Sequence, residues 1–220
     1  MQCCNDFEKS LRMKDYIISS SVLVRNGVAV CNGAVKYEHK GIDVAAFTKE
    51  LYKELKTDYP KFFKMDNLCK LAFVSVELLL KDHSVDSHDT GKVALVLSNA
   101  SASLDTDRTY FRSVEDKENY FPSPAVFVYT LPNIMMGEIC IRHKFTGENT
   151  FFISEKFDSE LLASCSENIL SSEKASCVIA GWVEINGDEW ESALFLVESF
   201  QNKSEQACSP KAMQEIYNSI

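Results

Sequence analysis

The spacing of apolar residues along the chain changes between a period of two and a period of three to four, which predicts alternating strands and helices. Residues 15–30 are rich in β-branched side chains and are interrupted at Asn26-Gly27, which predicts a strand, a tight turn and a second strand. Residues 92–97 form a short apolar run, typical of a strand buried on both faces. Further strands are predicted at residues 151–154, 176–185 and 191–198.

Helical spacing or helix-start residues mark the remaining structured segments. Helices are predicted at residues 42–55, 65–81, 106–114, 131–144, 157–172 and 209–217. Pro132 suits a first helical turn, and we expect that helix to end near Gly147. The polar stretch 98–124 predicts a surface excursion from the core. The alternation of strands with helices favours a mostly parallel sheet covered by helices.

Length and composition indicate one soluble globular domain. The chain has 220 residues, of which 45% are hydrophobic and 25% charged. No apolar run approaches the roughly 20 residues that a membrane-spanning helix needs, so we expect no membrane span. Residues 1–15 lack the basic start and apolar centre of a signal peptide, and we therefore expect a cytoplasmic protein.

Charge and cysteine usage exclude several classes of partner and cofactor. A net charge of -9 without a dense basic run argues against nucleic acid as a partner. An acidic surface also does not attract an acyl carrier protein, which is itself acidic, unless a local basic patch exists. The eight cysteines are scattered and include no CxxC pair, so we interpret them as reduced residues of the core. We expect neither a metal nor another cofactor.

An ordered set of short motifs carries a family resemblance. It consists of Leu131-Pro132-Asn133, Gly137, Ile141-Arg142, Gly147, Asn149, the run SCVIAG at residues 176–181, and Glu184. The set resembles the segments around the nucleophile of β-ketoacyl synthases, that is 3-oxoacyl-[acyl-carrier-protein] synthases of the thiolase-like superfamily. The resemblance covers roughly residues 16–200, about half the length of such an enzyme. It extends to short ketosynthase-like proteins encoded beside bacterial polyene and pigment biosynthesis genes.

This resemblance implies an α/β fold that corresponds to the N-terminal half of a thiolase-like enzyme. The expected architecture is a mostly parallel, five-stranded sheet covered by helices on both faces. The chain would then comprise an N-terminal extension at residues 1–15, a ketosynthase-like domain at residues 16–200, and a C-terminal tail with a short helix at residues 201–220.

The same resemblance assigns the nucleophile position to Lys156. A ketosynthase forms a thioester on a cysteine at the N-terminus of a helix, where free N–H groups and the helix dipole stabilise the thiolate. Lysine cannot do this, so the position is degenerate, and we expect Lys156 to be exposed. Cys140, Cys165 and Cys177 lie elsewhere in their predicted elements and are interpreted as core residues. No catalytic residue is therefore assigned.

The family's two catalytic histidines follow the nucleophile, whereas every histidine here precedes Lys156. His83 and His88 flank a polar segment that we interpret as a solvated loop rather than a metal site. His143 is expected to interact with the last carbonyls of its helix. The resemblance together with these losses predicts a catalytically inactive relative of ketosynthases.

The resemblance also implies a dimer strand. In the superfamily, the strand before the nucleophile is a sheet edge that pairs antiparallel with its copy across a two-fold axis. Here that strand contains the candidate pairing residues Asn149, Phe151, Phe152 and Ile153. The alternative is a monomer in which Glu155 and Lys156 protect the edge.

Three functions remain open at the level of the sequence. The first is an inactive partner subunit in fatty-acid or polyketide biosynthesis, either a homodimer or a heterodimer with a full-length ketosynthase, with an acyl carrier protein as a further partner. The second is a passive acyl-chain binder. The third is an acyltransferase or hydrolase with a nucleophile outside the family pattern, such as Ser154, although Ser154 has no histidine near it in the sequence.

Overall fold

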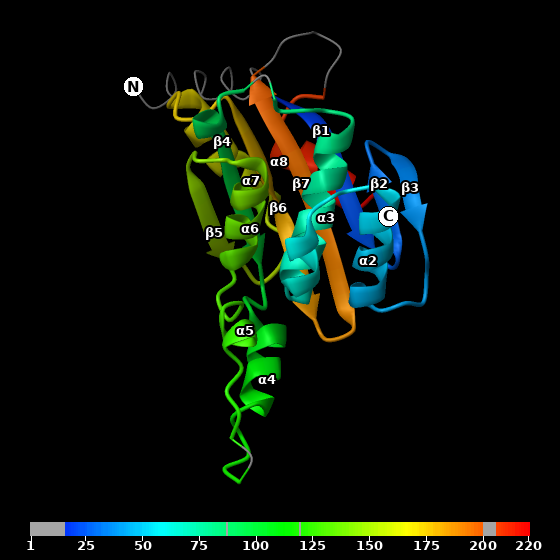
Figure 1. The fold of residues 1–220 in the computed structure, drawn as a ribbon. Coiled ribbons are helices and arrows are strands. Elements are labelled where there is room, and N and C mark those ends of the chain that lie inside the picture. Colours follow the sequence, from blue (N-terminus) through cyan, green and yellow to red (C-terminus); the bar gives the residue numbers. More distant parts are fainter. Residues whose placement is uncertain (1–15, 87, 119, 200–205) are drawn as a thin grey trace.

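The computed structural model describes residues 16–86, 88–118, 120–199 and 206–220, which form one seven-stranded sheet with helices on both faces (Figure 1). The strands are β1 (Tyr16–Arg25), β2 (Val28–Cys31), β3 (Ala34–Glu38), β4 (Val93–Asn99), β5 (Asn149–Ile153), β6 (Cys177–Asn186) and β7 (Glu189–Ser199). The helices are α2 (Val44–Glu54), α3 (Asn67–Lys81), α4 (Leu104–Arg112), α5 (Pro124–Phe127), α6 (Ile134–His143), α7 (Ser159–Ser171) and α8 (Pro210–Tyr217), with short 3-10 helices η1 (Pro60–Lys64) and η2 (Thr90–Lys92). The predicted extension at residues 1–15 and the first part of the predicted tail, 201–205, lie outside the described residues.

The N-terminal hairpin confirms the turn predicted at Asn26-Gly27. Both residues have positive φ, 53° and 74°, as the mirror-image turns of tight hairpins require. A Cβ on Gly27 would lie 2.4 Å from the carbonyl oxygen of His39, so only glycine fits there. A second hairpin at Asn32-Gly33 adds β3, which was not predicted. Nearly all of β3 is exposed, so it lacks the alternation of apolar and polar positions that marks a half-buried strand.

The sheet is mixed, and the expectation of a mostly parallel, five-stranded sheet was wrong. Its order is β3-β2-β1-β7-β6-β4-β5, and only the pairs β4–β5 and β4–β6 are parallel. The physical reason is the connection between β6 and β7. Asn186 pairs with Glu189 across a two-residue turn, which is too short for a crossover and forces antiparallel pairing.

Helices cover both faces of the sheet, as predicted. Helices α2, α3 and α6 enclose one cluster of buried side chains, and α7 and α8 enclose the other. Within β1, Val22 and Val24 belong to the first cluster and Leu23 to the second, because successive side chains of a strand point to opposite faces. The chain therefore forms two cores that share one sheet.

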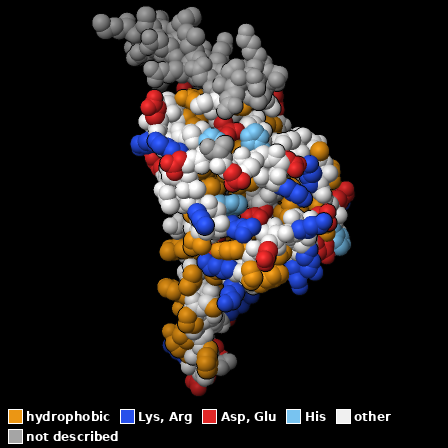
Figure 2. All heavy atoms as spheres, turned by 45° about the horizontal axis from the view of Figure 1, so that its top comes forward, with side chains coloured by type: hydrophobic (Ala, Val, Ile, Leu, Met, Phe, Trp, Pro, Cys, Tyr) orange, Lys and Arg blue, Asp and Glu red, His pale blue; other side chains and the backbone are white. Residues whose placement is uncertain are grey.

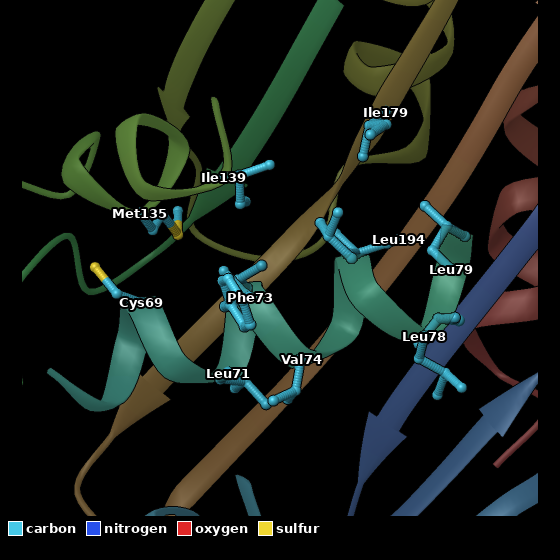
Figure 3. Close-up of a cluster of buried hydrophobic side chains, with 14 of the residues drawn as sticks. Cys69, Leu71, Phe73, Val74, Leu78, Leu79, Met135, Ile139, Ile179 and Leu194 are labelled. Carbon is cyan, nitrogen blue, oxygen red and sulfur yellow. The ribbon is translucent and has the colours of Figure 1, made fainter. Parts of the chain in front are cut away.

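Helix α3 is at the centre of the larger core. It packs between α2 and α6 and against β1, β6 and β7, so it is surrounded by other elements on most sides. In Figure 3, Cys69 and Phe73 lie on the side of the helix that faces Met135 and Ile139 of α6, whereas Leu71 and Val74 lie on the other side. Ten of the 15 residues of α3 are buried, and a helix with so much buried surface is stable only when it is enclosed by neighbours.

The end of α6 differs in detail from the prediction. The helix ends at His143, and Lys144 adopts the left-handed conformation with φ 59° in place of a glycine cap. Gly147 has another role, since a Cβ on it would lie 2.3 Å from the carbonyl oxygen of Val93. This glycine permits the close approach of the chain to β4 just before β5 begins.

The position of α3 predicts the effect of truncating its buried aromatic side chain. Phe73 is 1% exposed, and its ring lies with its centroid 5.4 Å from that of Tyr59. We expect Phe73→Ala to lower the free energy of unfolding by about 4 kcal/mol, because it leaves a cavity that the neighbours cannot fill. Urea denaturation measures this loss. The control is Phe121→Ala, at a side chain that is 80% exposed, and an equal loss in both variants would contradict the assigned core.

Candidate functional site

The position that the resemblance assigns to the nucleophile lies in the loop between β5 and α7. Lys156 is exposed in a bend, as predicted. The helix starts at Ser159, two residues later than predicted, and Asp158 caps it by accepting a hydrogen bond from the backbone N–H of Leu161 at 2.9 Å. A carboxylate therefore already satisfies an N–H group at this helix end. Lys156 lies outside the helix and does not replace the cysteine nucleophile of the family.

None of the described cysteines is an activated thiol. All six are free, and in each case burial raises the pKa, which disfavours the thiolate; they are Cys31, Cys69, Cys140, Cys165, Cys177 and Cys208. For Cys177 and Cys208 the pKa rises to about 12. Cys140 and Cys165 are only half-buried, so their assignment to the core holds in part.

The histidines after α3 lie at the opposite end of the sheet from Lys156. Lys156 follows the carboxyl end of β5, whereas His88 precedes β4 and contacts Ser176, which precedes β6. Since β4, β5 and β6 run parallel, their amino and carboxyl ends lie on opposite sides. No proton can therefore pass directly between His88 and the Lys156 loop.

The interpretation of His83 and His88 as residues of a solvated loop holds only in part, because the loop is largely exposed but both histidines are paired with a carboxylate. Nε2 of His83 lies 2.9 Å from one carboxylate oxygen of Glu198, and Nε2 of His88 lies 2.8 Å from the other. Glu198 is on β7 and pairs with Cys177 at the start of β6. No sequence pattern indicated this contact, because 110 positions separate Glu198 from His88.

His143 also has a different partner from the expected helix carbonyls. Its Nε2 lies 3.1 Å from Glu77 of α3, and Arg142 Nε lies 3.0 Å from the same carboxylate. Burial alone would raise the pKa of Glu77, but hydrogen bonds from His143 and Arg142 lower it to about 2. This ion cluster joins α6 to α3.

Strand β5 is the edge of the sheet, as predicted, because it pairs only with β4. Asn149 and Ile153 are exposed, while Phe151 packs on one core and Phe152 on the other. The backbone N–H of Ser154 donates to Asn99 of β4. Because N–H groups alternate in direction along a strand, those of Phe151 and Ile153 point to the free edge.

Beside this edge, an apolar arm extends from the body of the molecule (Figure 1). We define the apolar arm as residues 104–131, which include α4 and α5. Its exposed large hydrophobic side chains are Leu104, Phe111, Tyr120, Phe121, Phe127, Val128 and Leu131. Figure 2 shows hydrophobic side chains gathered along it. The predicted surface excursion at residues 98–124 is confirmed in part, because Ser98 and Asn99 are buried in β4 and the exposed segment continues to Leu131. Its surface carries large apolar side chains, which the polar stretch in the sequence did not indicate.

Two hydrogen bonds fix the base of the arm to the larger core. Thr106 of α4 donates to Asp66, which caps α3, at 2.5 Å. The hydroxyl of Tyr129 donates to Glu138 of α6 at 3.3 Å, and Glu138 is buried and ion-paired with Lys61 at 2.7 Å. These two contacts join the base of the arm to α3 and α6.

Within the described parts of the chain, no three or more histidine, cysteine or acidic side chains are placed to hold a metal ion. Among these same residues, no helix is both long enough and apolar enough to traverse a bilayer.

Comparison of the sequence with protein-family models and with curated proteins finds no match. Comparison of the structure finds ketosynthases. A structure described as the ishigamide ketosynthase/chain length factor has a TM-score of 0.61 at 18% identity, over 87% of this chain and 64% of that one. A type II polyketide synthase acyl-carrier protein in complex with its ketosynthase (AntDE:AntF) gives 0.58 at 14% identity, over 84% and 62%.

A third similar structure contains a chain of comparable length. It is the ketosynthase ApeO in complex with its chain length factor ApeC from Xenorhabdus doucetiae, with a TM-score of 0.57 at 14% identity, over 92% of this chain and 90% of that one. The chain thus spans less than two thirds of the first two structures and nearly all of the third. The predicted resemblance is confirmed at the level of the fold, which is that of a ketosynthase over part of its length.

The Glu77 cluster makes stability depend on pH in a defined direction. Because the pKa of Glu77 is lowered from 4.5 to about 2 on folding, its contribution is complete above about pH 4.5 and is lost as the pH falls toward 2. We expect Glu77→Gln to cost about 2 kcal/mol at pH 7 and progressively less below pH 4.5. Urea denaturation between pH 7 and pH 2.5 measures both. Glu155→Gln, at an exposed position, is the control, and a cost for Glu77→Gln that does not vary with pH would contradict the assigned ion cluster.

Proposed function

We propose that this protein is a non-condensing partner subunit of a ketosynthase in fatty-acid or polyketide biosynthesis, of the kind that makes polyene pigments. The observation that carries the proposal is an unpaired strand edge and an apolar arm beside the exposed Lys156, the residue to which the resemblance assigns the nucleophile position. In this proposal, this end of the sheet binds a partner protein and does not form a thioester. The proposal includes the domain boundaries given above and a cytoplasmic location.

The apolar arm supports a protein partner. Soluble monomers rarely expose large contiguous apolar patches, and those that do mostly use them for binding. Phe111, Phe121 and Phe127 are each more than half exposed. The hydrogen bond from Ser154 to Asn99 places the end of β5 next to the start of the arm. The free edge and the arm thus present one surface that offers both backbone donors and aromatic side chains.

The structural neighbours support the identity of that partner. Two of them are described as a ketosynthase with a chain length factor, and one as a ketosynthase in complex with an acyl-carrier protein. A full-length ketosynthase is therefore the first partner in the proposal, a second copy of this chain is the alternative, and an acyl carrier protein is a further partner. The net charge of -9 gives the acyl carrier protein the weakest support, since it is acidic as well.

The first test concerns condensation. We expect purified protein to form no carbon–carbon bond between acyl and malonyl carrier substrates, because a thiol at the helix end and histidines facing it are both lacking among the described residues. Lys156→Cys should not create this activity, since coupled catalytic groups act as a unit. Mass spectrometry of the products measures the outcome, and a ketosynthase with its own cysteine is the positive control. A condensed product from the wild type would overturn the proposal.

The second test concerns assembly through β5. We expect the chain to bind a ketosynthase, or its own copy, at about 50 μM, where association with a micromolar Kd would be nearly complete. Light scattering measures the mass of the complex. Ile153→Pro should abolish association, because it removes a donor on the free edge but leaves the donors that face β4.

The matched control is Ile153→Thr, which keeps both the β-branched shape and the backbone donor and should still assemble. A wild-type chain that stays monomeric alone and with the ketosynthase would refute the partner role. The passive binding of an acyl chain would then become the stronger of the remaining functions.

A further inference from the structure

A serine, a histidine and a glutamate form a connected chain at the amino end of the parallel strands. Oγ of Ser176 lies 2.6 Å from Nδ1 of His88, and Nε2 of His88 lies 2.8 Å from Oε1 of Glu198. Ser176 comes immediately before β6, Glu198 is on β7, and His88 is in the loop before β4. Three separate segments thus place a hydroxyl, an imidazole and a carboxylate within hydrogen-bond distance in series.

The carboxylate decides which nitrogen of His88 carries the proton. A carboxylate only accepts hydrogen bonds, so the nitrogen facing Glu198 must be protonated. In neutral imidazole the other nitrogen then accepts. The hydroxyl of Ser176 lies 2.6 Å from this nitrogen and 3.3 Å from the carbonyl oxygen of Lys92, so the nitrogen is the nearer of its two acceptors. This is the relation between nucleophile, base and orienting acid in serine hydrolases, with the two ring nitrogens exchanged.

Glu198 is held as an anion in this position. Burial alone would raise the pKa of its carboxyl, but hydrogen bonds from Ser19, His88 and His83 lower it below the ordinary value. Nε2 of His83 binds the oxygen that His88 leaves free. The carboxylate is therefore fixed from both sides, as a group that orients a catalytic base must be.

The cluster is open to a small substrate. Ser176 is half-buried, and the side chain of His88 retains 16% exposure. His88 also forms part of the wall of a cavity of about 400 Å³, whose lining includes the apolar Leu80, Val85 and Phe145 as well as the charged Glu77, Lys81, Asp86 and Arg142. Ser176 does not line this cavity and is connected to it through His88. This volume is enough for a short acyl chain beside the base.

We propose that Ser176 is a nucleophile for activated acyl esters and thioesters, with His88 as its general base and Glu198 as the residue that positions the base. The site lies at the end of the sheet opposite Lys156, so it is distinct from the surface assigned to the ketosynthase partner. The proposal goes beyond the partner function, and either can fail without the other.

The chemistry balances with water as the only co-reactant. Oγ of Ser176 attacks the acyl carbon while its proton passes to Nδ1 of His88, and the imidazolium then protonates the departing alkoxide or thiolate. The acyl group is left as an ester on Ser176. Water attacks this ester with the same transfer of a proton to His88 and back to the serine, which releases a carboxylic acid and restores the starting site.

The test uses a fluorophosphonate probe on the full chain at pH 8, with intact mass and peptide mapping as the readout. The probe should add once, on Ser176, with loss of fluoride. Labelling should disappear in Ser176→Ala and fall about 100-fold in His88→Gln. Ser154→Ala is the matched control and should label like the wild type, since no histidine is hydrogen-bonded to Ser154 in the described residues.

Thermal unfolding separates the positioning role of Glu198 from a structural one. Glu198→Gln should slow the labelling of Ser176 by much more than the change in the melting temperature of this variant accounts for. Circular dichroism checks that the variant is folded. Absence of an adduct on Ser176 in the wild type overturns the proposal, and so does equal labelling in folded His88→Gln. If His88→Gln does not fold, two results still decide the question. They are the mapping of the wild-type adduct to Ser176 and the loss of the adduct in Ser176→Ala, a variant that removes a single hydroxyl.

Discussion

The enclosure of α3 is the constraint on which the rest of the structure depends. Ten of its residues are buried, so it requires α2 on one side, α6 on the other and the sheet beneath. Ser75 adds a buried hydrogen bond to Ser192 of β7 at 2.6 Å, which fixes the helix on the sheet in one position. Residues near both ends of α3 also bind other elements of the structure. Asp66 at its start anchors the apolar arm, and Glu77 near its end binds Arg142 and His143 of α6.

The second face of the sheet is covered by α7 and α8, which pack on each other. Helix α8 packs beside α7, and the Tyr217 ring stacks on Phe157 with centroids 4.1 Å apart. The Tyr217 hydroxyl also donates to Glu191 at 2.6 Å, and Arg25 forms an ion pair with the same carboxylate. This contact ties the C-terminal helix to β1 and β7. The exposed residues of α7, Glu160, Ser164, Asn168 and Ser171, recur every three or four positions, so one face of that helix is adapted to a polar surrounding.

The two ends of the sheet carry different chemistry because strand direction separates them. The carboxyl ends of β4 and β5 lead into the apolar arm and the Lys156 loop, where exposed aromatic side chains and a free strand edge favour contact with a protein. The amino ends of β4 and β6 meet the last part of β7, where Glu198 gathers two histidines. A partner bound at the first end would leave the second end accessible. Assembly and the chemistry proposed for Ser176 are therefore compatible in one molecule.

Most of the elements could be predicted from the amino-acid sequence, because their signals are local. Apolar spacing identified α2, α3, α7 and all strands except β3, and Asn26-Gly27 identified the first turn. Short motifs around Pro132 and Gly147 identified the kind of fold and, through it, the edge strand β5. The antiparallel direction of β7 also has a local signal, the two-residue turn Gly187-Asp188, which the sequence analysis missed. Side-chain partners, in contrast, depended on the tertiary structure. The packing of β7 beside β6 brought Glu198 to His83, His88 and, through His88, Ser176. These contacts join residues about 90 to 115 positions apart, and hydrophobic periodicity carries no information about partners at such a separation.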